Sequence, residues 1–155
     1  MIDIYEELKL LTASLESHGV EYALCGGLAL AVHGYVRATV DLDLLILPDE
    51  VKSGLKIVQG LGYDIQAKPM KFADGKIIIY RMTKVVSESK DYLSVDFIVV
   101  TEELKPIWEG RKKLKLEDGA IKVVSRQGLI ELKQIRGSKQ DLADIDRLKG
   151  EGDES

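Results

Sequence analysis

Apolar and polar positions alternate along the chain in two periods, one helical and one strand-like. Ile4, Leu8, Leu11 and Leu15 recur three or four residues apart, which predicts an amphipathic helix over residues 3–18. The same two patterns predict strands over residues 20–25, 38–47, 63–67, 76–85, 92–100, 112–116 and 120–124, and helices over residues 28–33, 51–61, 102–109, 126–136 and 139–149. We therefore expect an α/β (α+β) chain with a mixed central β-sheet flanked by helices.

The predicted strand 38–47 is apolar on both faces except for two acids near its start. Asp41 and Asp43 are two residues apart, so in a strand both side chains point to the same face. Two carboxylates this close repel each other, which raises the pKa of one of them unless a cation joins them. A divalent metal ion with oxygen ligands is the natural partner.

A third acid interrupts another buried strand. Asp96 lies among mainly apolar residues in the predicted strand 92–100, and a lone buried carboxylate requires a cation or hydrogen bonds. Two explanations remain open. Asp41, Asp43 and Asp96 together hold one or two Mg²⁺ (or Mn²⁺) ions, as phosphoryl transfer requires. Alternatively, Asp96 pairs with a core Lys or Arg, and the other two acids lie on a solvated strand face.

Residues before the two acids could contact a phosphate. Gly26 and Gly27 separate a predicted strand from a helix, so the backbone can approach a ligand closely and the helix N-terminus can face an anion; a plain tight turn is the alternative. Arg37 could clamp a phosphate or form a surface ion pair. Thr39 shares the face of Asp41 and could bond to it or to a phosphate.

Composition narrows the class of protein. A chain of 155 residues fits one domain, which we expect over residues 1–150 with a frayed, charged tail at 151–155. The net charge of −4 gives no global basic field of the kind that favours nucleic-acid binding. The single cysteine, an acidic N-terminal start and the lack of an apolar run near the roughly 20 residues of a membrane span predict a cytoplasmic protein.

Taken together, these motifs resemble the signature of the polymerase-beta-type nucleotidyltransferase superfamily. The matching residues are Cys25-Gly26-Gly27-Leu28-Ala29-Leu30, His33-Gly34, Arg37-Ala38-Thr39 and Asp41-Leu42-Asp43, with Asp96 on a later strand. The resemblance is closest to small nucleotidyltransferases akin to the abortive-infection toxin (AbiEii-like) branch. It implies a nucleotidyltransferase fold and Mg²⁺-dependent transfer of a nucleoside monophosphate from a nucleoside triphosphate to a hydroxyl group of RNA, protein or a small molecule, with release of pyrophosphate.

The resemblance also implies roles for individual residues. Gly26 and Gly27 would hold the triphosphate. Asp41 and Asp43 would bind metal. Asp96 would complete the site and act as a base towards the acceptor hydroxyl.

The C-terminal part of the chain matches the toxin-related branch less closely. Lys133 flanks the apolar stripe of the predicted helix 126–136, where it could reach a phosphate or snorkel to solvent. Asp141 fits either an acidic motif of that branch or a capping box with Ser138. His33 could close the predicted helix 28–33 or act as a general base, and Asp144 could pair with Arg147 or Lys133.

Three functions are consistent with these patterns. The leading hypothesis is a metal-dependent nucleotidyltransferase that, lacking a separate acceptor-binding domain, forms a homodimer or uses a partner protein. The alternative is a non-catalytic nucleotide-binding protein or toxin–antitoxin partner that retains the fold. A metal-binding protein that does not bind phosphate is the third.

Overall fold

The computed structural model describes residues 3–32, 41–86, 91–117, 119–137, 143, 145, 146, 148 and 149. The strands are β1 (Ala23–Cys25), β2 (Asp41–Ile46), β3 (Ile65–Gln66), β4 (Met70–Phe72), β5 (Ile77–Val86), β6 (Asp91–Val99), β7 (Lys112–Leu116) and β8 (Gly119–Val123). The helices are α1 (Ile4–Ser17), α2 (Gly26–Val32), α3 (Val51–Gly60), α4 (Lys105–Glu109) and α5 (Arg126–Arg136), with 3₁₀ turns at Pro48–Glu50, Ala73–Gly75 and Glu102–Leu104.

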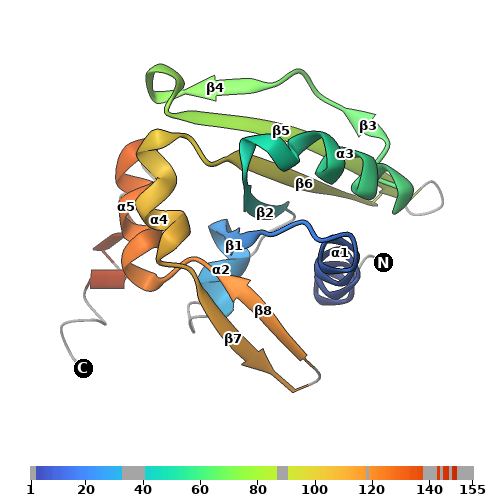
Figure 1. Cartoon of the computed structure of the whole chain (residues 1–155), viewed down its shortest axis with the longest axis horizontal. Coiled ribbons are helices and arrows are strands. Elements are labelled where there is room, and N and C mark those ends of the chain that lie inside the picture. Colours follow the sequence, from blue (N-terminus) through green and yellow to red (C-terminus); the bar gives the residue numbers. More distant parts are fainter. Residues whose placement is uncertain are drawn as a thin grey trace.

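The strands form one mixed sheet in the order β3-β5-β6-β2-β1-β8-β7, and β4 pairs with β5 (Figure 1). β2 runs parallel to β6 and antiparallel to β1, while β1 runs parallel to β8. β5–β6 and β7–β8 are antiparallel pairs. The predicted mixed sheet with flanking helices is therefore confirmed, and β2, which carries the paired acids, lies at its centre.

α3 covers one face of this central region. A Cβ on Gly54 of α3 would lie 2.7 Å from Cδ1 of Ile46 and 3.2 Å from Cζ of Phe97, so the helix packs closely on β2 and β6. Side chains alternate along a strand, and Ile46 therefore points away from the face of Asp43. α3 and the paired acids lie on opposite sides of the sheet.

Most predicted elements are present with shifted ends. The predicted strand 20–25 is shorter and forms only Ala23–Cys25, and α2 begins at Gly26 itself rather than after a separate turn. The sequence did not predict β4, a three-residue strand whose residues are largely exposed and which therefore lacks the apolar alternation of a longer strand. The expected helix 139–149 and the tail lie largely outside the described residues.

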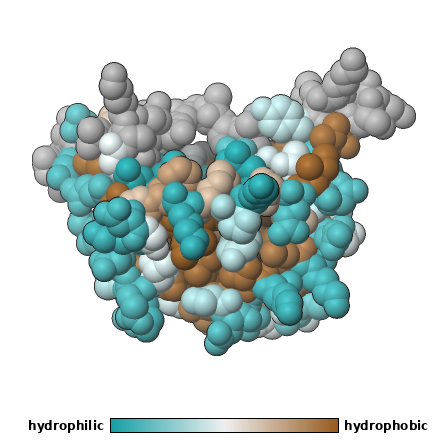
Figure 2. All heavy atoms as spheres, turned by 90° about the horizontal axis from the view of Figure 1, so that it is seen from above, coloured by the Kyte–Doolittle hydropathy of each residue, from teal (hydrophilic) through white to brown (hydrophobic). Residues whose placement is uncertain are grey.

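Short strands form the edge of the sheet next to β5. Ile65 in β3 and Phe72 in β4 are about half exposed, at 53% and 48%. Figure 2, which views the molecule from above relative to Figure 1, shows hydrophobic residues between hydrophilic ones on that face. Short edge strands limit pairing with another sheet.

Within the described residues, no helix combines the length and the hydrophobicity needed to cross a membrane.

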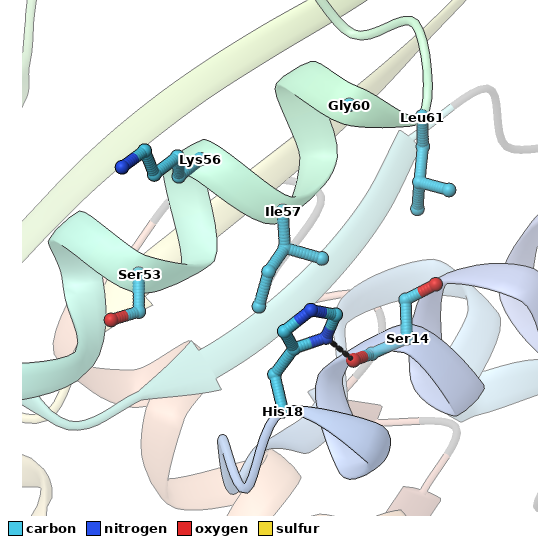
Figure 3. Close-up of a pocket in the computed structure, with 7 residues that line it drawn as sticks. All are labelled: Ser14, His18, Ser53, Lys56, Ile57, Gly60 and Leu61. Atoms are coloured by element: carbon cyan, nitrogen blue, oxygen red, sulfur yellow. Dashed lines mark hydrogen bonds between the residues drawn. The ribbon is translucent and has the colours of Figure 1, made fainter.

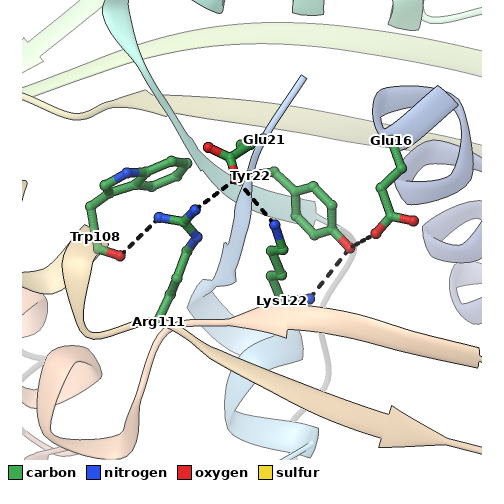
Figure 4. A network of polar contacts seen from close by, with 6 residues as sticks. All are labelled: Glu16, Glu21, Tyr22, Trp108, Arg111 and Lys122. Carbon is green, nitrogen blue, oxygen red and sulfur yellow. Dashed lines mark hydrogen bonds and ion pairs between the residues drawn. The ribbon is translucent and has the colours of Figure 1, made fainter. Parts of the chain in front are cut away.

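A buried tyrosine joins the β7–β8 hairpin to α1 (Figure 4). The hydroxyl of Tyr22, a fully buried residue, donates a hydrogen bond to Oε1 of Glu16 at 2.9 Å and accepts one from the backbone N–H of Lys122 at 3.3 Å. Burial raises the pKa of Tyr22, so the hydroxyl keeps its proton and remains a donor.

A second set of contacts reinforces the same junction. Glu21 accepts hydrogen bonds from Arg111 at 3.0 Å and from Lys122 at 3.2 Å (Figure 4). The Arg111 guanidinium lies 3.9 Å from the centroid of the Trp108 ring, and Trp108 is buried in the core. These contacts thus join the hairpin to the segment before β1 and to α4.

We expect Tyr22→Phe to lower the free energy of unfolding by about 1 kcal/mol, because it removes two hydrogen bonds without removing the ring. Chemical denaturation measures this change. Tyr5→Phe is the matched control, because Tyr5 is 53% exposed and its change should be close to zero. Equal stabilities of Tyr22→Phe and the wild type would show that the junction does not depend on this hydroxyl.

Candidate active site

The strand register gathers the predicted acids on one face of the sheet. Asp41 and Asp43 are partly exposed, whereas Leu42 and Leu44 between and beyond them are fully buried. Asp43 lies directly opposite Asp96 in the parallel pairing of β2 with β6, and paired residues project to the same face. The two strands on which the sequence placed these acids are therefore neighbours, and their carboxylates form one group.

Gly26 makes close packing against this group possible. Cys25 lies opposite Asp43 in the pairing of β1 with β2, and the next residue, Gly26, has a φ of +70°. A Cβ at Gly26 would lie 2.7 Å from Cγ and 2.9 Å from Cβ of Asp43, and closer still to Oδ2. The sequence predicted that the glycine permits close approach of a ligand; the structure shows close approach of the Asp43 side chain.

Asp96 forms the ion pair that the sequence left open as an alternative. Arg81 on β5 lies opposite Asp96 in the antiparallel register. Its Nε donates to Oδ1 and its Nη2 to Oδ2, each at 2.8 Å. Asp96 is only 3% exposed, so this fork compensates the charge of a buried carboxylate.

Arg81 is a residue of this group that the sequence analysis did not place at the site. It interrupts the apolar part of β5, much as Asp96 interrupts β6. That interruption was a usable signal, but the pairing of the two depends on the β5–β6 register, which single-sequence patterns do not specify.

Burial and mutual repulsion raise the pKa values of the acids in this group. Burial, and then the charges of Asp96 and Asp41, raise the pKa of Asp43 to about 7. Burial and the charge of Asp96 also raise the pKa of Asp41, while Arg81 opposes the rise. Burial and the charge of Asp43 raise the pKa of Cys25 well above its usual range, so this thiol remains protonated.

Lys133 on α5 faces inward. Lys133 is only 4% exposed, which contradicts the snorkelling alternative, and its charge, together with that of Arg136, lowers the pKa of Asp43 and of Cys25. The last turns of α5 therefore bring positive charge to the carboxylate group.

Several predicted site residues cannot be placed. Arg37, Thr39, His33, Asp141 and Asp144 lie outside the described residues, and their roles remain predictions. Gly27 lies buried in α2, next to Gly26.

The described residues contain no group of three or more His, Cys, Asp or Glu side chains arranged to hold a metal ion. Arg81 engages both oxygens of Asp96, which leaves Asp41 and Asp43 as the carboxylates whose charge this fork does not neutralise. Carboxylate oxygens are the ligands that Mg²⁺ and Mn²⁺ prefer. The chemistry of the donors thus suits such an ion, although the observed arrangement is not a three-acid cage.

A pocket of about 490 Å³ lies between α1 and α3 (Figure 3). Its lining residues are Ser14, His18, Ser53, Lys56, Ile57, Gly60 and Leu61. Because α3 packs on the face opposite to Asp43, this pocket is separated from the carboxylates by the sheet. It contains none of the residues that the sequence predicted for the site.

The raised pKa of Asp43 predicts a pH-dependent stability difference between the wild type and Asp43→Asn. With a native pKa of about 7 and an unfolded value of about 3.9, only the native wild type holds a proton between these limits. Wild-type stability should therefore fall relative to the variant by up to about 1.4 kcal/mol per pH unit as the pH rises from about 4 to 7, and then level off.

Chemical denaturation of both proteins over this range, with chelator present, measures the difference. A constant difference across the range would contradict the assigned burial and repulsion at Asp43.

Comparison with known proteins supports the fold. No protein-family model matches the sequence, and no curated protein matches it. The structure is similar to a Thermotoga maritima protein provisionally assigned as a nucleotidyltransferase, at a TM-score of 0.63 and 13% identity over 97% of this chain and 96% of that one.

Two antibiotic-modifying proteins are also similar in structure. The lincosamide antibiotic adenylyltransferase LnuA in its lincomycin-bound form gives a TM-score of 0.56 and 18% identity over 93% of this chain and 95% of that one. ANT(2")-Ia in complex with adenylyl-2"-tobramycin gives a TM-score of 0.59 and 13% identity over 92% of this chain and 85% of that one. At these identities the likeness establishes the fold, which is the predicted nucleotidyltransferase fold.

Proposed function

We propose that this protein is a metal-dependent nucleotidyltransferase that transfers a nucleoside monophosphate from a nucleoside triphosphate to a hydroxyl acceptor and releases pyrophosphate. The carboxylate group carries the proposal. Asp41 and Asp43 share one face of β2, and Asp96 lies opposite Asp43 on β6, within a fold shared with nucleotidyltransferases.

The residues present are suited to a divalent cation. Asp41 and Asp43 would hold Mg²⁺ or Mn²⁺, and Asp96 would join them once Arg81 releases it. Burial, and then the charges of Asp96 and Asp41, raise the pKa of Asp43, and a cation between the carboxylates would relieve the part of that rise that comes from repulsion. When bound, such an ion would neutralise phosphate charge and polarise the phosphoryl group.

The surrounding residues would bind and orient the two substrates. Positive charge from Lys133 near Asp43 would attract the triphosphate, as would the backbone at Gly26 and Gly27. Arg37 and Thr39 are proposed to contact the same phosphates. Asp96 is proposed to accept the proton of the acceptor hydroxyl, which requires that its bonds to Arg81 be weakened in the reacting complex, since a carboxylate bound to a guanidinium is a weak base.

The acceptor is proposed to be a small hydroxylated molecule, with RNA or protein as the other classes. Two neighbours in structure are named for antibiotics, lincosamides in one case and tobramycin in the other. Membership of the abortive-infection toxin branch, a cytoplasmic location and assembly as a homodimer or with a partner protein remain proposals.

One observation favours a second candidate function. Arg81 neutralises Asp96 in the described structure, which is what a structural ion pair in a non-catalytic protein would look like. A nucleotide-binding protein or toxin–antitoxin partner that retains the fold is therefore the alternative.

Pyrophosphate release tests the proposal. The protein is incubated with Mg²⁺ and each of ATP, GTP, CTP and UTP, with and without mixtures of aminoglycosides, lincosamides, total RNA or proteins as acceptors. The proposal predicts that at least one nucleotide releases pyrophosphate and that chelation of Mg²⁺ stops the reaction. Nucleotide binding without pyrophosphate release under any of these conditions would favour the non-catalytic alternative.

A further inference from the structure

The Arg81–Asp96 pair joins a fixed residue to an exposed one. The Asp96 side chain is 5% exposed, whereas that of Arg81 is 39% exposed. Asp96 is held within β6 between the neighbouring strands β2 and β5. The guanidinium can therefore move towards solvent, whereas the carboxylate cannot. Asp96 would then need another cation in its place, because an unpaired buried charge is costly.

The guanidinium lies where a cation at Asp96 would also have to bind. Arg81 uses both oxygens of Asp96, and Asp96 lies directly opposite Asp43. A metal ion that included Asp96 among its ligands would have to share or displace these bonds, and the positive guanidinium would repel the ion. Arg81 and a metal ion thus compete for the same carboxylate.

Two other cations, Lys84 and Arg111, have different partners. Lys84 is three residues further along β5, so it points to the other face of the sheet, and it pairs there with Glu7 and lies 4.7 Å from the centroid of the Tyr63 ring. Arg111 pairs with Glu21 at the hairpin junction. Arg81, by contrast, donates to both oxygens of Asp96.

We propose that Arg81 is an exchangeable counter-ion of the carboxylate group. It pairs with Asp96 when no metal is bound, a divalent cation at Asp41 and Asp43 displaces it, and its freed guanidinium then binds a phosphate of the nucleotide. This inference rests on the proposed function and adds to it a coupling between metal binding and phosphate binding. A guanidinium released on the same face is suited to phosphate because it can bind two oxygens at once.

The test compares Mn²⁺ binding by the wild type, Arg81→Gln and Arg81→Lys, measured by electron paramagnetic resonance of free Mn²⁺. A pH of about 8.5 keeps the carboxylates ionised in all proteins. Arg111→Gln is the matched control, because it makes the same change in charge at an ion pair outside the group. Circular dichroism verifies that each variant is folded.

We expect Arg81→Gln to bind Mn²⁺ roughly tenfold more tightly than the wild type, since a repelling unit charge near the ion is lost. Arg81→Lys, which keeps the charge but replaces the fork by a single point donor, should show a smaller gain. If Arg81→Gln does not fold, the gain in Arg81→Lys decides. Arg111→Gln should bind as the wild type does. Unchanged or weaker Mn²⁺ binding in the folded Arg81 variants would overturn the proposal.

Nucleotide affinity at saturating Mg²⁺ is the second measurement, and it should fall about tenfold in Arg81→Gln through loss of a charge-assisted phosphate contact. A purely structural role of Arg81 would not move the two affinities in opposite directions. Unchanged nucleotide affinity would overturn the phosphate half of the proposal. Tighter Mn²⁺ binding in a protein whose wild type binds no nucleotide would support the competition and overturn the proposed function.

Discussion

Asp43→Asn is expected to abolish Mg²⁺-dependent nucleotide binding and to lower the rate of nucleotidyl transfer by about a thousandfold or more, the scale on which loss of a key electrostatic group acts. Asp43 lies between Asp96 and Cys25 in the sheet register, so it is the central carboxylate of the group. Asparagine keeps the shape of the side chain and removes the charge that a metal ion requires.

The variant should still fold. Its neutral side chain removes both the burial of a charge and the repulsion that raise the pKa of Asp43 to about 7, so its stability near neutral pH should equal or exceed that of the wild type. Pyrophosphate release measures the rate of transfer, nucleotide titration measures binding, and thermal unfolding measures stability.

Asp64→Asn is the matched control, since Asp64 is exposed and lies outside the carboxylate group. It should retain wild-type binding and transfer. Full activity in Asp43→Asn would exclude this carboxylate from the reaction, and loss of folding would show that its role is structural.

Gly26→Ala is expected to lower the free energy of unfolding by about 2–5 kcal/mol and to displace Asp43. The backbone at Gly26 has a φ of +70°, a conformation that costs an alanine about 1–2 kcal/mol. The added methyl group would also lie only 2.7 Å from Cγ of Asp43, and such overpacking costs about 1–3 kcal/mol more. Chemical denaturation and Mn²⁺ binding measure the two effects.

Gly19→Ala separates the effect of backbone strain from the effect of the contact with Asp43. Gly19 has nearly the same φ, +71°, but a Cβ there meets no atom within 4 Å. The free energy of unfolding of Gly19→Ala should fall only by the cost of backbone strain, about 1–2 kcal/mol. This variant should bind Mn²⁺ as the wild type does. If both alanine variants lose equal stability and bind metal equally, the contact between Gly26 and Asp43 does not organise the site.

The sequence was sufficient to predict the strands that carry the acids. Alternation in β2 placed Asp41 and Asp43 on one face. Asp96 was identified as the acid that interrupts the apolar part of β6. That β2 and β6 are neighbours was expected only through the family resemblance, because strand pairing depends on contacts distant in sequence.

The partners of these residues were not predictable in the same way. Arg81 pairs with Asp96 only because β5 and β6 are in one particular register. The burial of Lys133 depends on how α5 packs, whereas helical phase only places it beside the apolar stripe. Both the Arg81–Asp96 pairing and the burial of Lys133 depend on packing between segments that are distant in the sequence.

Isothermal titration of ATP, GTP, CTP and UTP into the wild type and Asp43→Asn, with and without Mg²⁺, tests the central claim most directly. We predict saturable binding of at least one nucleotide by the wild type that requires Mg²⁺ and is lost in Asp43→Asn. A folded wild type that binds none of the four nucleotides, or a variant that binds them equally well, would contradict the assignment of this carboxylate group as a metal-dependent nucleotide site.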